Sequence, residues 1–193
     1  MKPIVVPILG MHRSGTSCAA RILRAAGAFF PEPSMKRETA NLMGHYETGE
    51  VVRINDYILR LSGGSWEKPP DRLLSDEHSR ASIHNFLERF NNISVAAWKD
   101  PRMSLTWPIW KPFIENYYLI VCFRHPLSVA HSLKVREGWD LERGLALWKI
   151  YASSLMAAIQ KESNVFWLDY DTPLSEWPGM IKTMCGRLGL ASS

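Results

Sequence analysis

A segment near the N-terminus has residue types and spacing suited to binding a phosphate or a sulfate. In "GMHRSGTS", residues 10–17, Gly10 and Gly15 follow the P-loop pattern G-x-x-x-x-G-K-[ST], but Thr16 stands where the lysine belongs. The apolar run 4–9 precedes this segment and a helical pattern follows it. A strand that leads through glycines into a helix places backbone amides around an anion, at the positive end of the helix dipole. An ordinary strand-to-helix turn is the alternative, and the combination of these features makes it the weaker one.

The composition of this loop favours a sulfate-containing ligand over a nucleoside triphosphate. The amides of residues 13–17, Ser14 among them, and the hydroxyls of Thr16 and Ser17 are expected to bind the anion, with Arg13 as the cation. A guanidinium can bridge two oxygens of a phosphate or sulfate. In a P-loop enzyme, lysine and magnesium balance the charge at the β- and γ-phosphates, whereas one phosphate followed by a sulfuryl group carries less charge. The altered loop therefore predicts sulfuryl transfer, with no metal required.

The same segment contains a second pattern, which we do not interpret as functional. Cys18 and Arg24 have the C-x5-R spacing of cysteine-dependent phosphatases, which would make Cys18 a nucleophile. The residues between them, "AARIL", are helix formers without glycine, so we expect a helix there and not an anion-binding loop. We interpret Cys18 as a packing residue.

A second candidate anion site lies in "CFRHPLSVAHSL", residues 122–133. Arg124 follows an apolar strand at its carboxyl end, where ligands of open α/β sheets bind, and Pro126 begins a helix immediately afterwards. Ser128 and Ser132 are four residues apart and share one face of that helix, so one of the hydroxyls can join Arg124 on a shared anion. A surface salt bridge is the alternative for Arg124 alone, and the pairing with Ser132 favours ligand binding.

Strands alternate with helices along the chain and must position both motifs. The two clearest strands, 4–9 and 117–123, are continuously apolar, which is typical of strands buried on both faces of a parallel sheet. The alternation implies right-handed crossovers and an α/β three-layer sandwich of the P-loop nucleotide-binding type, with a central parallel sheet of four or five strands. A long loop from Gly63 to Ser75 is a candidate lid. The predicted strands are 4–9, 94–98, 117–123 and 165–170, and the predicted helices are 17–26, 49–61, 76–90, 126–136, 141–162 and 174–188.

The composition fits a single domain over residues 1–193 that binds a small anion. The 23 basic residues exceed the 19 acidic ones by a formal charge of +4 without forming blocks, which favours an anionic ligand over nucleic acid. Three cysteines form no pairable framework, so we expect a reducing compartment. We find neither a signal-peptide core nor eighteen consecutive apolar residues, so we expect a cytoplasmic protein without a membrane span.

These two motifs resemble those of the sulfotransferases that use 3′-phosphoadenosine 5′-phosphosulfate (PAPS). "RSGTS" is similar to their 5′-phosphosulfate loop, and "CFRHPLSVAHSL" is similar to their 3′-phosphate motif, with a Ser eight residues after the Arg. Ser128 is a departure, because many members carry an acidic residue there. The resemblance extends to "AAWKDPRMSL", to "NLMGHYETGEVVRINDYIL" and to the last predicted strand and helix, where Tyr170 matches an aromatic position near the adenine. It implies PAPS as the donor and 3′-phosphoadenosine 5′-phosphate (PAP) as the product.

The resemblance and the chemistry together suggest catalytic residues. Glu47 is the first candidate for the general base that removes the acceptor's proton, and a carboxylate that only complements a helix start is an equally good interpretation. Lys99 is expected to contact the transferred sulfuryl group, while Arg13 helps to stabilise the charge that develops as PAP departs. Asp100 could act as the base or bind a metal in a kinase, although pairing with a neighbouring cation is simpler. His12 and His45 are further candidates.

The acceptor and two other classes of function stay open at this point. We expect a small-molecule or carbohydrate acceptor, and Trp66 in the long loop is a candidate contact for it. A P-loop kinase would use Asp100 and Ser17 with ATP and magnesium, but it would leave Thr16 and the second motif unexplained. A non-catalytic nucleotide-binding protein would keep Arg13 and the second motif but lack a competent base.

Overall fold

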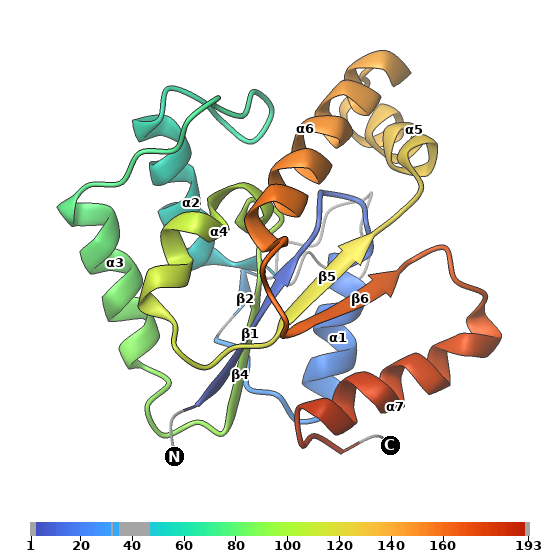
Figure 1. Ribbon diagram of the computed structural model, residues 1–193. Helices are drawn as coiled ribbons and strands as arrows, with labels where there is room; N and C mark the ends of the chain where they lie inside the picture. Colours follow the sequence, from blue (N-terminus) through green and yellow to red (C-terminus); the bar gives the residue numbers. More distant parts are fainter. Residues whose placement is uncertain (1–2, 32, 35–46, 192–193) are drawn as a thin grey trace.

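The computed structural model describes residues 3–31, 33–34 and 47–191. Its centre is a parallel sheet in the order β4-β1-β5-β6 (Figure 1), which confirms the predicted α/β fold with four strands. Every predicted strand is present, with ends that differ from the prediction by two residues at most. The strands are β1 (Ile4–Leu9), β4 (Val95–Lys99), β5 (Leu119–Phe123) and β6 (Val165–Asp169).

Side chains that alternate along the strands form two separate hydrophobic clusters, one on each face of the sheet. On β1, Val5 and Leu9 belong to one cluster, whereas Val6 and Ile8 belong to the other. Because both faces are covered, the strands consist of continuous apolar runs and not of alternating apolar and polar residues. The result is the predicted three-layer sandwich.

The helices divide between the two faces. In Figure 1, α1 and α7 cover one face, whereas α2, α3, α4 and α6 lie on the other, and α5 packs beside α6. The helices are α1 (Thr16–Ala25), α2 (Gly49–Leu61), α3 (Glu77–Glu88), α4 (Met103–Trp110), α5 (Pro126–Glu137), α6 (Leu141–Ile159) and α7 (Trp177–Arg187), with 3-10 turns at Lys111–Phe113 and Leu174–Glu176. The predicted helix 174–188 is therefore a 3-10 turn followed by α7.

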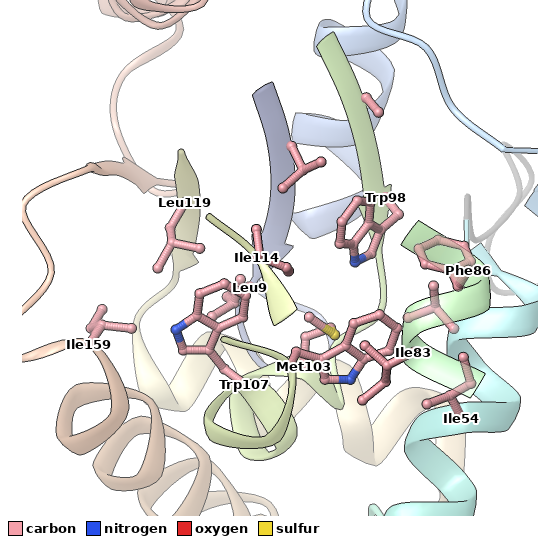
Figure 2. Close-up of a cluster of buried hydrophobic side chains, with 14 of the residues drawn as sticks. Leu9, Ile54, Ile83, Phe86, Trp98, Met103, Trp107, Ile114, Leu119 and Ile159 are labelled. Atoms are coloured by element: carbon pink, nitrogen blue, oxygen red, sulfur yellow. The ribbon is translucent and has the colours of Figure 1, made fainter. Parts of the chain in front are cut away.

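Helix α4 is absent from the sequence prediction, and its burial explains why. Its sequence, "MSLTWPIW", is apolar on almost all sides and contains Pro108, so it has no amphipathic period. Trp107 and Trp110 are fully buried in the larger cluster. Figure 2 shows Trp107 beside Leu9 and Met103, so α4 fills the space between the sheet and the outer helices.

Two further features lie near the carboxyl ends of the strands. The short strands β2 (Pro33–Ser34) and β3 (Glu47–Thr48) form an antiparallel pair, which places Glu47 directly before α2. The predicted long loop lies between α2 and α3. Tyr151 on α6 donates a hydrogen bond of 3.1 Å to the carbonyl oxygen of Trp66, and this bond attaches the loop to α6. Within the described residues, we find no helix long and apolar enough to cross a membrane.

Candidate functional site

A cavity of about 160 Å³ lies at the carboxyl ends of the four parallel strands. Ligands of open α/β sheets bind at this edge. Its lining combines the loop after β1, the first turn of α1, the end of β4, and residues that follow β5 and β6. The lining residues are His12, Arg13, Gly15, Thr16, Ser17, Cys18, Glu47, Lys99, Pro101, Arg124, Arg136 and Tyr170.

The first glycine of the loop is required by a close backbone approach. Gly10 has a φ of 140°, and a Cβ at this position would lie 2.4 Å from the carbonyl oxygen of Cys122 on β5. Its amide donates a hydrogen bond of 2.8 Å to Oγ of Ser104 on α4. Sequence patterns could not reveal this role of Ser104, because it lies 94 residues from Gly10. The start of the loop is therefore fixed by two other elements.

The second glycine ends the loop and allows an aromatic ring to pack on it. Arg13 and Gly15 both have left-handed backbone angles, with φ of 69° and 86°. A Cβ on Gly15 would lie 2.2 Å from Cδ2 of Tyr170. Helix α1 begins immediately afterwards at Thr16, so the amides of its first turn lie at the cavity. This geometry is the strand-loop-helix arrangement that the motif predicts.

The two predicted anion motifs are in direct contact. Nε of Arg13 donates a hydrogen bond of 2.7 Å to Oγ of Ser132 on α5. Nη1 of Arg124 lies 3.4 Å from the carbonyl oxygen of Arg13, to which it donates a long hydrogen bond. Ser132 is not itself among the described lining residues, and it reaches the site through Arg13. A single cavity therefore joins both motifs.

Arg124 has support from the segment after β6. Its guanidinium lies over the ring of Tyr170, 5.1 Å from the ring centre. Asp171 accepts from Nε of Arg124 at 3.4 Å, and its other oxygen accepts a hydrogen bond of 2.6 Å from the amide of His125. Asp171 thus supplies a carboxylate partner for Arg124.

Arg136 is a cation of this cavity that the sequence analysis missed. It lies on α5, one turn after Ser132, so the i, i+4 spacing that paired Ser128 with Ser132 could have found it. Its guanidinium lies 5.8 Å from the ring centre of Trp66. Burial lowers the pKa of Arg13, and the nearby charges of Arg136 and Arg124 lower it further. Three arginines that repel one another around one cavity favour an anionic ligand.

Lys99 and Glu47 form an ion pair on the other side of the cavity. Nζ of Lys99 lies 3.0 Å from Oε1 of Glu47, and the Lys99 side chain is only 2% exposed. Burial lowers the pKa of Lys99, whereas Glu47 opposes that change. The lining residues thus include four basic side chains, two of them Arg13 and Lys99, and one carboxylate. The cavity can hold an anion of more than one charge beside the carboxylate of Glu47.

The remaining candidates are placed as follows. Asp100 is fully buried, with Oδ1 on Arg102 and Oδ2 on Asn55, so it has the pairing role that the sequence offered as the simpler one. Ser14 is also buried and is not among the lining residues. His12 does line the cavity. His45 lies outside the described residues.

Cys18 and Trp66 are the two other residues that the sequence analysis interpreted. Cys18 and Arg24 both lie in α1, so the segment between them is helical as expected, and burial raises the pKa of the Cys18 thiol. Trp66 packs between the rings of His12, at 4.5 Å, and Trp139, at 5.6 Å. These contacts give Trp66 a packing role in the loop, and a contact with the acceptor stays a prediction.

The fold and cavity define a P-loop-type α/β protein with a cavity lined by basic side chains at the carboxyl ends of its strands. A sequence model of the Sulfotransferase family matches residues 3–193, so the chain belongs to this family. No curated protein gives a significant sequence match.

Solved structures with similar folds include both sulfotransferases and kinases. The sulfotransferase domain of the Synechococcus PCC 7002 olefin synthase is 13% identical with a TM-score of 0.59, over 97% of this chain and 74% of that one. A sulfotransferase from Alicyclobacillus acidocaldarius is 14% identical with a TM-score of 0.54, over 100% and 83% of the two chains. Shikimate kinase from Bacteroides thetaiotaomicron is 10% identical with a TM-score of 0.55, over 97% and 99%. Because sulfotransferases and kinases share this fold, the two activities have to be distinguished by the residues of the site.

Proposed function

We propose that this protein transfers a sulfuryl group from PAPS to a hydroxyl or amine acceptor and releases PAP. The observation that carries the proposal is a single cavity lined by four basic side chains from separate elements and by one carboxylate, Glu47. PAPS carries two anionic groups, the 5′-phosphosulfate and the 3′-phosphate, and the cavity has two groups of cations. A cytoplasmic location, inferred from the cysteine usage, is part of this proposal.

The donor-binding residues divide between the two anionic groups. The first-turn amides of α1, the hydroxyls of Thr16 and Ser17, and Arg13 are suited to the 5′-phosphosulfate. Arg124 and Arg136, which line the cavity, are suited to the 3′-phosphate. The hydroxyl of Ser132 is not among the described lining groups; it accepts a hydrogen bond from Arg13 and can donate its own proton to the same anion. Tyr170 packs against Gly15 and Arg124, which is consistent with an aromatic position near the adenine.

The reaction needs a base on one side of the sulfur and a cation on the other. Glu47 takes the proton of the acceptor as the acceptor's oxygen or nitrogen forms a bond to sulfur. The bond between the sulfur and the bridging oxygen of the 5′-phosphate breaks, and PAP leaves with the electron pair of that bond. Lys99 and Arg13 stabilise the negative charge that develops on the bridging oxygen. Nζ of Lys99 lies 3.0 Å from Oε1 of Glu47, so this ion pair has to open for Lys99 to reach the bridging oxygen while Glu47 faces the acceptor.

A ligand screen by thermal unfolding tests the donor. PAP, ATP, and ATP with magnesium are added separately, because a ligand that binds only the folded protein raises its stability, by about 2.7 kcal/mol at a hundred times its dissociation constant. We expect PAP to raise the unfolding temperature more than ATP with magnesium does. The reverse order would favour a kinase and contradict the proposal.

Turnover is then measured as PAP release from PAPS with a panel of acceptors. The panel contains a phenol (2-naphthol), an alcohol (1-hexanol), a sugar (N-acetylglucosamine) and an amine (hexylamine), so that each acceptor chemistry is represented. Binding of PAP without PAP release for any acceptor class would favour a non-catalytic nucleotide-binding protein.

A further inference from the structure

A network of buried charged side chains lies behind Glu47, and Arg102 is at its centre. Arg102 comes directly before α4, and its side chain is 11% exposed. Glu47 and Pro101 line the cavity, but Arg102 is not among the described residues that do so. Any influence of Arg102 on a bound ligand therefore passes through its neighbours.

Arg102 faces three carboxylates at once. Its Nη1 lies 2.8 Å from Oδ1 of Asp100 and 3.9 Å from Oε2 of Glu47. Its Nε lies 2.7 Å from Oδ1 of Asp56. The other oxygen of Glu47, Oε1, is the one that lies 3.0 Å from Nζ of Lys99. The two oxygens of Glu47 thus face two different cations, which restricts the orientation of its carboxylate.

Asp100, the main partner of Arg102, is held in place by a chain of hydrogen bonds that involves α2 and α4. Oδ2 of Asp100 accepts a hydrogen bond of 2.8 Å from Asn55 on α2. Oδ1 of Asn55 accepts hydrogen bonds of 2.8 Å from Thr106 and Trp110, both on α4. Asn55 and Asp100 are fully buried. The guanidinium of Arg102 is therefore attached to a rigid part of the protein.

The charge and shape of arginine suit this position. Burial disfavours a charge on Arg102, but Asp100, Asp56 and Glu47 together raise the pKa of its guanidinium above the ordinary value. The planar guanidinium presents donors in several fixed directions, whereas a lysine offers one flexible point charge. A lysine could replace the charge but could not face the three carboxylates in the same geometry.

We infer that Arg102 is a positioning residue that holds the carboxylate of Glu47 toward the cavity and affects turnover only through Glu47. This inference rests on the proposed role of Glu47 as the general base. Asp100 and Asn55 keep Arg102 in place, and Lys99 holds the opposite oxygen of the base. A displacement of a reacting group by about 1 Å can slow a reaction about a hundredfold, so small changes in this network affect turnover.

A double-mutant cycle between Arg102 and Glu47 tests the inference. Arg102→Lys keeps the positive charge, and Arg102→Met removes it; each is made in the wild-type protein and in the Glu47→Gln variant. Turnover is measured as PAP release with the acceptor of the panel that gives the highest wild-type rate. The affinity for PAP and the unfolding temperature are measured for every variant.

We expect the effect of the Arg102 substitutions on kcat to depend strongly on whether Glu47 is present. With Glu47 present, both Arg102 variants should lower kcat on the order of tenfold to a hundredfold, while the affinity for PAP stays near that of the wild type. In the Glu47→Gln background the same changes should lower kcat by less than about twofold, because the residue through which Arg102 acts is already absent. Should Arg102→Met fail to fold, Arg102→Lys gives the same comparison.

Other outcomes overturn the inference, and they separate it from the proposed function. An equal factor in both backgrounds, or a parallel loss of PAP affinity, would show that Arg102 acts by another route while leaving the proposed function intact. A normal rate for Glu47→Gln alone would remove Glu47 as the base and the inference with it. Arg89→Met is the matched control, since Arg89 also pairs with a carboxylate, that of Glu50, three residues after Glu47, but does so at the surface. It should leave kcat unchanged.

Discussion

Arg13 donates a hydrogen bond of 2.7 Å from Nε to Oγ of Ser132, across 119 residues of sequence. The first residue belongs to the loop after β1, and the second belongs to α5, so one bond joins the two anion motifs. Their relative position is thus set within the protein itself. A ligand with two anionic groups would meet binding groups that are already arranged, which reduces the entropy lost on binding.

Arg124→Ala should weaken PAP much more than adenosine 5′-phosphosulfate, because only PAP carries a 3′-phosphate. A hydrogen bond to a charged group is worth about 1.5–3 kcal/mol, so the loss for PAP should lie in that range. Calorimetric titration of the variant with both ligands provides the measurement and its internal control. Equal losses of binding free energy for the two ligands would contradict a contact between Arg124 and the 3′-phosphate.

Arg136→Ala should also weaken PAP, by about tenfold or more, because it removes a cation of the donor cavity. The matched control is Arg143→Ala. Arg143 also lies over a tryptophan ring, 3.8 Å from the centre of Trp139, but it is not among the described lining residues. If both variants bound PAP equally well, Arg136 would serve only to pack the long loop.

Gly15→Ala should destabilise the protein in two separable ways. The left-handed backbone of Gly15 costs an alanine roughly 1–2 kcal/mol, and the new Cβ collides with Tyr170. In a Tyr170→Ala background the collision disappears and only the backbone cost remains. Urea unfolding of the four proteins measures both contributions. An identical cost of Gly15→Ala in both backgrounds would mean that Tyr170 does not press on the loop in solution.

The acid side of the stability curve should depend on a hydrogen bond at the start of α3. The hydroxyl of Tyr57 donates to Asp76 at 2.6 Å, and this bond, followed by the amide of Ser79, lowers the pKa of Asp76 to about 2. A carboxyl with a lowered folded-state pKa contributes stability above its unfolded pKa and loses it as the pH falls through the folded value. Stability should therefore decrease between about pH 4 and pH 2.

Tyr57→Phe is the variant that tests this dependence. It removes the largest cause of the lowered pKa, so the loss of stability over the same interval should be smaller than in the wild type. Urea unfolding at several pH values between 5 and 2 gives the comparison. Parallel curves for the two proteins would assign the acid sensitivity to other carboxyls.

The sequence predicted the sheet and the strand-loop-helix arrangement of the first candidate anion motif because their signals are local. Continuous apolar runs mark strands that are covered on both faces, and glycines beside hydroxyl residues mark the loop between β1 and α1. Helix α4 escaped prediction because a helix that is apolar all round has no period. Prediction from local patterns thus fails where an element is buried completely.

The candidate site was predictable only in part, for a related reason. Arg13, Lys99 and Arg124 each follow a strand or belong to a motif, so their positions at one edge of the sheet could be inferred. The attachment of Gly10 to Ser104, and the contact of Arg102 with Glu47, depend on packing between distant segments. Such contacts leave no spacing in the sequence by which they could be found.

The last prediction compares Glu47→Gln with Asp100→Asn, the two carboxyls that the sequence offered as the base. Glu47 is 20% exposed at the cavity, so its variant should fold normally, bind PAP almost unchanged, and lose about a hundredfold or more in turnover. Asp100 is fully buried between Arg102 and Asn55. Removing its charge leaves part of the charge on Arg102 unpaired, and breaking a buried pair costs on the order of 3 kcal/mol.

Stability and turnover measured on the same preparations therefore decide between the two residues. Asp100→Asn should lower the unfolding temperature clearly, and its turnover should fall only as far as the displaced Arg102 disturbs Glu47. Glu47→Gln should change turnover without a comparable change in stability, because its carboxylate is partly exposed and an amide of the same shape replaces it. A Glu47→Gln protein of normal rate, beside a stable but inactive Asp100→Asn protein, would reverse the assignment and make the buried carboxylate the base.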